Sequence, residues 1–218
     1  MYFKSRETAG RLLAGQVVKR YANAPVAVVA LSDGGVVVGM QIALKLRAVL
    51  MMLMSDTIDL PRETQALAGI TSDGAFSYNH AYSQGEIDEL VSEYHNFIDQ
   101  QKMQRLHDMR RSIGRADLLR RDLLQDKVII LVSDGLFDGF TLDLAFEFLK
   151  PIRSKKVIIA TPLASVQAVD RMHILSDGIF CLNVLEDYME TNHYYTLHDL
   201  PPHERVVDTV EKILAQWK

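Results

Sequence analysis

The tripeptide Ser-Asp-Gly occurs four times in the 218-residue chain, beginning at Ser32, Ser72, Ser133 and Ser176. The unequal spacing of the four copies excludes a structural repeat of fixed period. Ser72 and Ser176 begin turns that lead into predicted strands, whereas Ser32 and Ser133 follow predicted strands and precede predicted helices. Open α/β sheets bind ligands at such strand-to-helix loops. The loops that begin at Ser32 and Ser133 are therefore the candidate ligand-binding loops.

These loops need a sheet and helices to position them, and the sequence alternates between apolar runs and helical patterns. That alternation is typical of a parallel sheet covered by helices on both faces. We find no linker or domain boundary, so we expect a single domain over residues 1–218. A hairpin is predicted at 66–78, because Asp-Gly tolerates the positive φ of a tight turn. The predicted strands are 25–31, 49–54, 128–132, 157–161 and 179–182, and the predicted helices are about 6–21, 36–47, 83–112, from 140 onward, around 166–172 and 202–217.

The loop after the third predicted strand carries a family resemblance. Residues 128–141 read Val-Ile-Ile-Leu-Val-Ser-Asp-Gly-Leu-Phe-Asp-Gly-Phe-Thr. This segment resembles the phosphoribosyl-pyrophosphate loop of phosphoribosyltransferases, which has a hydrophobic strand, two acidic residues, a short connection and then Thr-Gly-x-Thr. Residues 31–36, Leu-Ser-Asp-Gly-Gly-Val, are similar to the Pro-Arg-Gly-Gly-Val loop of one bacterial branch. The arginine-rich stretch 105–121 and the segments 157–162 and 177–181 extend the likeness along most of the chain.

The resemblance implies the type I phosphoribosyltransferase fold, a doubly wound, mainly parallel sheet with a small hood of hairpin and helix at about 60–115. It also implies roles for the loop, because backbone N–H groups at a helix start bind the sugar 5′-phosphate. In the family, threonine hydroxyls add donors and the acidic pair holds the ribose hydroxyls. The matching positions here are Ser133 and Asp134 for the acidic pair, Asp138 for the first threonine, then Gly139 and Thr141. Only Asp134, Gly139 and Thr141 fit the family pattern.

If the chain is an active transferase, the resemblance assigns the 5′-phosphate to Gly135, Gly139 and Thr141. Gly34 and Gly35 would then bind the pyrophosphate through main-chain donors, and magnesium would arrive with the substrate. From the sequence we identify no catalytic residue and no ligand for a metal ion bound by the protein itself. The small-molecule ligand in this interpretation is phosphorylated.

Acidic residues replace the family's anion-binding groups at several positions. Asp138 would face the phosphate, and two unit charges about 4 Å apart at an effective dielectric constant near 20 repel by roughly 4 kcal/mol, about a thousandfold in affinity. Asp33 stands where the resembling branch has an arginine, and Asp56 lies where it has Arg-Lys. With Asp134, these residues suggest a cationic ligand or divalent metal; otherwise they are turn and cap residues. Asp138 is then the predicted N-cap of the following helix.

Other polar residues suggest weaker alternatives. His193, His198 and His203 lack the i, i+4 spacing of paired metal ligands, so we interpret them as surface loop residues. The basic stretch could contact nucleic acid or a phosphorylated substrate, but such runs are more often solvated helix faces. The stretch contains Arg105, Arg110, Arg111, Arg115, Arg120 and Arg121.

Composition narrows the class of protein. With 48% hydrophobic and 24% charged residues the chain is typical of a globular protein, and its net charge of -4 disfavours general binding to nucleic acid or to anionic membranes. No secretory signal or bilayer-spanning run is recognisable, and Cys181 is the single cysteine, which we expect to be a buried, reduced thiol. We therefore expect a cytoplasmic protein, and the resemblance makes a homodimer plausible.

Two hypotheses follow from the altered loops. The first is a phosphoribosyltransferase-like protein with weak or no activity on phosphoribosyl pyrophosphate that acts as a ligand-binding or regulatory module. The second is an active phosphoribosyltransferase that transfers phosphoribose to a nucleobase or similar acceptor. Family chemistry depends on positioning and charge stabilisation of the sugar, so altered anion contacts favour the first hypothesis.

Overall fold

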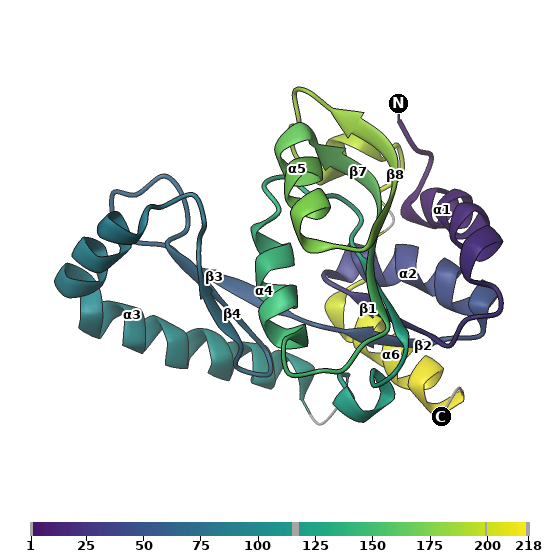
Figure 1. Cartoon of the computed structure of the whole chain (residues 1–218), viewed down its shortest axis with the longest axis horizontal. Coiled ribbons are helices and arrows are strands. Elements are labelled where there is room, and N and C mark those ends of the chain that lie inside the picture. The colour runs from purple at the N-terminus through teal and green to yellow at the C-terminus, as the bar shows by residue number, and fades with distance from the viewer. Residues whose placement is uncertain (1, 115–117, 199, 217–218) are drawn as a thin grey trace.

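A five-stranded parallel sheet forms the centre of the molecule in the computed structural model, which describes residues 2–114, 118–198 and 200–216. The strand order is β2-β1-β6-β7-β8. Figure 1 labels β1, β2, β7 and β8 of this sheet. Every neighbouring pair runs parallel, so all five strands end at the same edge of the sheet. The strands are β1 (Val26–Ala30), β2 (Val49–Met52), β6 (Val128–Val132), β7 (Lys156–Ser165) and β8 (Gly178–Leu185).

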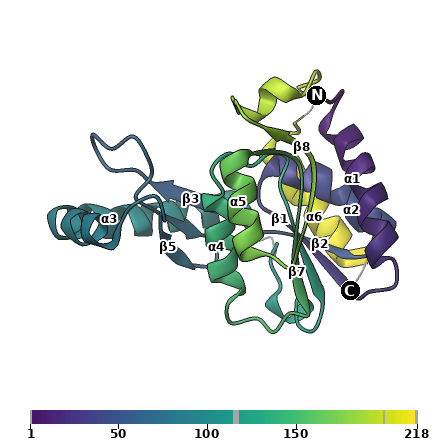
Figure 2. The same cartoon turned by 45° about the horizontal axis from the view of Figure 1, so that its top comes forward.

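Helices cover both faces of this sheet, which confirms the predicted doubly wound α/β class (Figure 2). Helices α1 and α2 pack together on one face, and α4 and α5 pack on the other. Helix α6 packs against α2 and β2. The bounds are α1 (Arg6–Tyr21), α2 (Asp33–Leu46), α4 (Phe140–Leu149), α5 (Val166–Leu175) and α6 (His203–Gln216).

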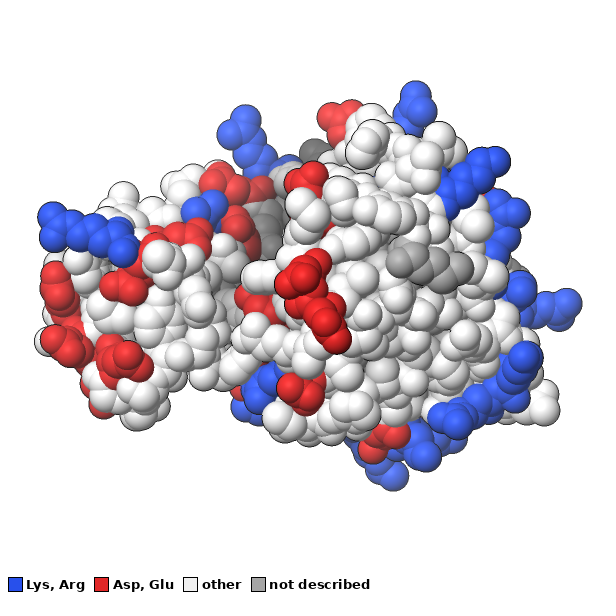
Figure 3. Space-filling view, turned by 90° about the horizontal axis from the view of Figure 1, so that it is seen from above, with Lys and Arg blue, Asp and Glu red and all other residues white. Residues whose placement is uncertain are grey.

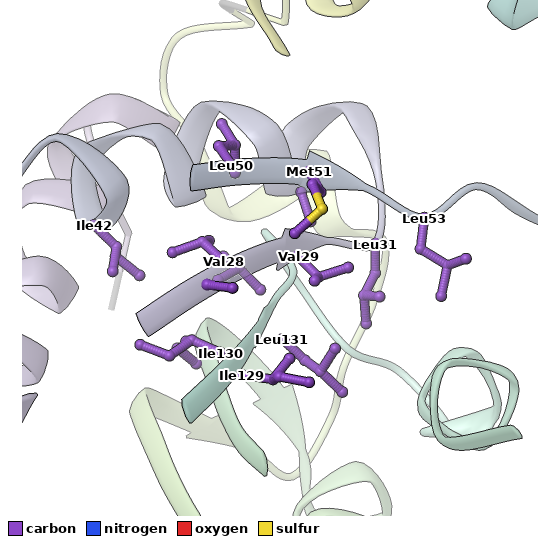
Figure 4. Close-up of a cluster of buried hydrophobic side chains, with 14 of the residues drawn as sticks. Val28, Val29, Leu31, Ile42, Leu50, Met51, Leu53, Ile129, Ile130 and Leu131 are labelled. Atoms are coloured by element: carbon purple, nitrogen blue, oxygen red, sulfur yellow. The ribbon is translucent and has the colours of Figure 1, made fainter. Parts of the chain in front are cut away.

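The core lies between the sheet and these helices. All residues of β1, β2 and β6 are buried, and the register sets Val28 of β1 between Leu50 of β2 and Ile130 of β6 (Figure 4). Strands that are buried on both faces need apolar side chains on both, which explains their uninterrupted apolar sequences. The fully buried strands β1 and β6 thereby support the two loops that follow them.

A second, antiparallel sheet and a long helix project from one side of the molecule and form the hood (Figure 1). The predicted hairpin is confirmed as β4 (Ala68–Thr71) and β5 (Phe76–Tyr78). Strand β3 (Ser55–Ile58), which the sequence did not reveal, pairs with β4. The predicted capping box at Ser83 is present and starts the helix α3 (Gln84–Ile113). A small apolar cluster that includes Ile58, Leu67, Ile87 and Ile98 holds the helix on the sheet.

The hood contacts the main body at helix α4. Gly69 of β4 packs so tightly on this helix that a Cβ atom would lie 2.6 Å from Leu144 Cδ1. His80, which follows β5, places Nδ1 2.7 Å from Oδ2 of the buried Asp143 in the first turn of α4. Arg171 of α5 also pairs with Asp143. These contacts hold the hood beside the start of α4.

Strands β7 and β8 are both longer than the predicted strands 157–161 and 179–182. Strand β7 continues past Pro162 to Ser165, and β8 continues to Leu185. Thr161 of β7 pairs with Cys181 of β8, and beyond Pro162 the pairing resumes between Leu163 and Asn183. An isolated bridge also joins Ala164 of β7 to Leu136. The extension therefore supports the loop after β6.

No helix in the described part of the chain is both long enough and apolar enough to cross a lipid bilayer.

Two glycines of α1 provide a test of how closely this helix approaches α2. A Cβ atom at Gly10 would lie 2.9 Å from the Val38 carbonyl oxygen, whereas nothing lies within 4 Å of one at Gly15. Gly10→Ala should destabilise the fold by about 1–3 kcal/mol through overpacking. Gly15→Ala should stabilise it by roughly 0.5–1 kcal/mol through helix propensity. Chemical denaturation of both variants measures the difference, and equal effects would contradict the close approach.

Candidate functional site

The two candidate loops meet at the edge where the parallel strands end. Strands β1 and β6 are neighbours, so the loops that follow them lie side by side, and Ser32 Oγ donates a hydrogen bond of 2.8 Å to Asp134 Oδ1. Between the loops is a cavity of about 300 Å³, which we call the loop cavity. Its walls are formed by Leu31, Ser32, Ser133, Asp134, Gly135, Leu136, Phe137, Asp138, Thr141 and Thr191.

Asp134, the predicted ribose-binding acid, is engaged within the protein. Its Oδ2 accepts a hydrogen bond of 2.7 Å from Nε of Arg6, the first residue of α1, whose side chain is only 2% exposed. Its Oδ1 accepts the bond from Ser32, and its carbonyl oxygen accepts one of 2.6 Å from the Tyr195 hydroxyl. Both carboxylate oxygens are thus bound before any ligand arrives.

Arg6 was not among the residues that the sequence singled out. Its guanidinium lies 4.5 Å from the centre of the Tyr195 ring, and Nη2 donates to Asn192 Oδ1 at 2.6 Å. These contacts bring the start of α1 and the segment after β8 onto the loop after β6. Because Arg6 and Asp134 are 128 positions apart, no local motif could have linked them.

The predicted pyrophosphate-binding glycines lie inside α2 and do not line the loop cavity. The Gly35 N–H donates to Ser32 Oγ at 2.8 Å, which is the N-cap bond of the helix. Gly34 packs directly on the Asp134 carboxylate, so no side chain fits there. These glycines allow close packing between the two loops.

Asp33 also lies outside the loop cavity and has a partner of its own. Its Oδ1 and Oδ2 lie 2.9 and 3.1 Å from Nδ1 of His203, the first residue of α6. The interpretation of His203 as a surface loop residue is therefore wrong. Its ring joins the start of α6 to the start of α2.

Asp138 sits at the start of α4, where the resembling family has a threonine. Its Oδ1 accepts the Phe140 N–H at 2.9 Å, so the predicted bond between this carboxylate and the helix backbone is present. The N-cap itself is Gly139, one residue later than predicted, with a φ of 80° that favours glycine. Asp138 therefore occupies one N–H group at the start of α4.

The loop that carries Asp138 is fixed to β7. The Leu136 N–H donates to the Leu163 carbonyl at 3.0 Å, and the Ser165 N–H donates to the Leu136 carbonyl at 3.0 Å. The Ser165 hydroxyl also donates to the Phe137 carbonyl. The half-buried Asp138 is thus held in a defined position at the cavity wall.

Hydroxyl groups form much of the remaining wall. Ser133 donates to the Gly135 carbonyl at 2.8 Å, and Thr191 hydrogen-bonds with the Tyr188 hydroxyl at 2.8 Å. Thr141 lies in the first turn of α4 and lines the cavity beside Asp138. Burial raises the pKa of the Tyr188 phenol, which therefore stays neutral at physiological pH.

The four acidic residues that suggested a cation are not brought together. Only Asp134 and Asp138 line the loop cavity, while Asp33 pairs with His203 and Asp56 pairs with Arg105 in the hood at 3.2 Å. Within the described residues no group of three or more His, Cys, Asp or Glu side chains could hold a metal ion. The geometry gives the proposed cation cluster no support.

Three arginines of the arginine-rich stretch pair with carboxylates. Arg105 binds Asp56, Arg121 binds Asp73 in the hairpin turn of the hood, and Arg120 binds Asp122. Arg115 lies outside the described residues. The Arg121–Asp73 pair joins the main body to the hood, and all three pairs reduce the charge available to nucleic acid.

A second cavity of about 520 Å³ adjoins the loop cavity, and Phe137 lines both. The Phe137 and Tyr188 rings lie 5.8 Å apart in a tilted arrangement, and Phe137 is 59% exposed. We call this second cavity the aromatic cavity after Phe137 and Tyr188, and Asp170, Glu186 and Asp187 also line it. Figure 3 shows acidic side chains across the middle of the face seen from above, with Lys and Arg along its margins.

Cys181 lies beyond these cavities, half-buried in β8. Burial raises the pKa of its thiol, so the reactive thiolate is scarce at neutral pH. The prediction of a buried thiol is therefore met only in part, since Cys181 is half-buried.

Comparison with known proteins places this site in a family. A family model described as the phosphoribosyl transferase domain matches residues 4–188. Proteins from two strains of Mycobacterium tuberculosis, provisionally named phosphoribosyl transferases, are 27% identical over 185 residues, which are 83% of this chain but 40% of those proteins. The chain thus spans less than half the length of these curated relatives.

Solved structures show the same fold. The protein TT1426 from Thermus thermophilus superposes with a TM-score of 0.75 at 24% identity, covering 100% of this chain and 99% of the other. A hypothetical protein from Neisseria gonorrhoeae with bound ppGpp superposes with a TM-score of 0.50 at 12% identity, covering 96% and 98%. With the doubly wound sheet and the loop after β6, the family match settles the assignment: this chain belongs to the phosphoribosyl transferase domain family.

Proposed function

We propose that this family member has little or no activity on phosphoribosyl pyrophosphate and acts as a ligand-binding or regulatory module. The observation that carries the proposal is the internal engagement of both acidic groups in the loop after β6. Asp134 is bound by Arg6 and Ser32, and Asp138 binds the Phe140 N–H. An active transferase would need the first group for ribose hydroxyls and the second position for the 5′-phosphate.

Charge in the loop cavity supports the same proposal. None of the ten lining residues is Lys, Arg or His, and two are aspartates. Arg6, which contacts Asp134 of the cavity wall, is neutralised by this aspartate. Phosphate groups bind where oriented N–H groups and positive charge meet, and here one N–H of the helix start is taken by a carboxylate.

The active transferase remains the alternative, and two retained residues favour it. Gly139 keeps the positive φ of the helix start, and Thr141 keeps its place on the cavity wall. If transfer occurs, phosphoribosyl pyrophosphate with its magnesium must enter the loop cavity. Asp138 must then turn away from the Phe140 N–H.

Calorimetric titration with phosphoribosyl pyrophosphate and magnesium separates the two functions. The unmodified chain should show no binding at micromolar concentrations. Asp138→Thr, which restores the family residue and removes roughly 4 kcal/mol of repulsion, should gain measurable affinity. Asp138→Asn is the matched control, because it removes the charge while its amide oxygen can still accept the Phe140 N–H. Micromolar binding by the unmodified chain, or release of pyrophosphate with a nucleobase acceptor, would overturn the proposal.

Stability measurements test whether Arg6 and Asp134 act as a buried pair. Arg6→Met should cost about 3–5 kcal/mol of unfolding free energy, because it leaves the Asp134 charge buried without its partner. Arg11→Met on the same helix is the control, since Arg11 pairs with Glu7 while both are more than half exposed, and it should cost less than about 1 kcal/mol.

A double substitution separates the pair from the packing of each side chain. Arg6→Met combined with Asp134→Leu removes both charges, so the loss should be well below the sum of the two single losses. Denaturant unfolding of the three variants gives this coupling energy. Strict additivity would show that the two side chains act independently.

A further inference from the structure

The loop cavity has a small volume, hydroxyl walls and one carboxylate whose second oxygen is free for a ligand. We propose that it binds the sugar of an unphosphorylated nucleoside, with a pentose hydroxyl donating a hydrogen bond to Asp138. This inference rests on the proposed function, because it assigns a ligand to the same loops once phosphoribosyl pyrophosphate is excluded. The proposed ligand is neutral and donates a hydrogen bond through a pentose hydroxyl, whereas phosphoribosyl pyrophosphate is an anion.

The chemistry of Asp138 carries the inference. A threonine offers a hydroxyl donor to a phosphate oxygen, whereas an ionised carboxylate only accepts hydrogen bonds. Oδ1 of Asp138 already accepts the Phe140 N–H, and no other hydrogen bond of this carboxylate occurs among the described residues. Oδ2 can therefore accept from a hydroxyl, and charge-assisted bonds of this kind are roughly twice as strong as neutral ones. The position that selects phosphate in the family thus selects a hydroxyl here.

The rest of the cavity wall suits a pentose. Thr141 presents a hydroxyl group that can both donate to and accept from sugar hydroxyls. The Ser133 and Thr191 hydroxyls already hydrogen-bond within the protein and can still accept from a sugar hydroxyl. A volume of about 300 Å³ is at the small end of the range for ligand pockets. The Asp134 carboxylate is fully engaged, so Asp138 is the charged acceptor that remains in the wall.

The aromatic cavity next to the loop cavity favours a nucleoside over a free pentose. Phe137 lines both cavities, so a planar base attached to the sugar reaches the Phe137 and Tyr188 rings. Asp170, Glu186 and Asp187 on the same wall can accept hydrogen bonds from the N–H groups of a base. These three carboxylates disfavour a phosphorylated ligand in this cavity.

Calorimetry with four probes tests the inference: adenosine, ribose, adenosine 5′-monophosphate, and phosphoribosyl pyrophosphate with magnesium. Adenosine should bind the unmodified chain at least a hundredfold more tightly than its monophosphate, because the phosphate would meet Asp138. Ribose should bind more weakly than adenosine, because it lacks the base. If ribose binds as tightly as adenosine or more tightly, the cavity is a site for a free pentose and the proposal of a nucleoside ligand is wrong.

Substitutions at one position locate the contact. Asp138→Asn should weaken adenosine binding about tenfold and strengthen binding of the monophosphate, so that the preference between them narrows. Asp99→Asn on the exposed face of α3 is the matched control and should change neither affinity. An unchanged thermal midpoint for Asp138→Asn without ligand would show that the fold is intact.

The outcomes distinguish this inference from the proposed function. If neither adenosine nor ribose binds, or if the monophosphate binds as well as adenosine, the inference fails while the proposed function stands. If phosphoribosyl pyrophosphate binds the unmodified chain at micromolar concentration, the proposed function fails as well.

Discussion

The buried ion pair between Arg6 and Asp134 is the contact on which the site depends. It ties the start of α1 to the loop after β6, and Ser32, Asn192 and Tyr195 add hydrogen bonds to its two residues. Among the described residues, the buried Nη1 of Arg6 has no hydrogen-bond partner. Removing two charges from water costs several kcal/mol each, so such a pair persists only when its geometry and hydrogen bonds are favourable. Here four separate segments supply them. The pair therefore fixes the positions of these segments around the loop cavity.

Periodicity was enough to predict the parts of this fold that the backbone and the core determine. The apolar runs of β1 and β6 are continuous because both faces are buried, and the loops at Ser32 and Ser133 then had to meet at one edge. Strand β3 escaped prediction because Ser55, Asp56 and Thr57 show no apolar alternation; it forms by pairing with β4. The full length of β7 depends on β8 and Leu136 in the same way.

The partners of the site residues could not be predicted, because they come from distant parts of the chain. Family resemblance placed Asp33, Gly34 and Gly35 opposite a pyrophosphate, but packing gives these residues other partners. Gly34 accommodates the Asp134 carboxylate, and Asp33 meets His203 from a helix 170 positions away. A motif identifies which backbone positions form a loop, whereas long-range contacts decide which of its groups remain free for a ligand.

Asp138 is the residue through which the proposed function connects the hydrogen bonds of a loop with its choice of ligand. The Phe140 N–H is one of the donors at the start of α4, and such donors need an acceptor from a side chain, from water or from a bound anion. The aspartate satisfies that donor itself, so the loop is complete without an anion. The same carboxylate then repels any phosphate that approaches. Under the proposed function, weaker phosphate binding and a loop that is complete without an anion both follow from this one charge, and the fold that positions the charge need not change.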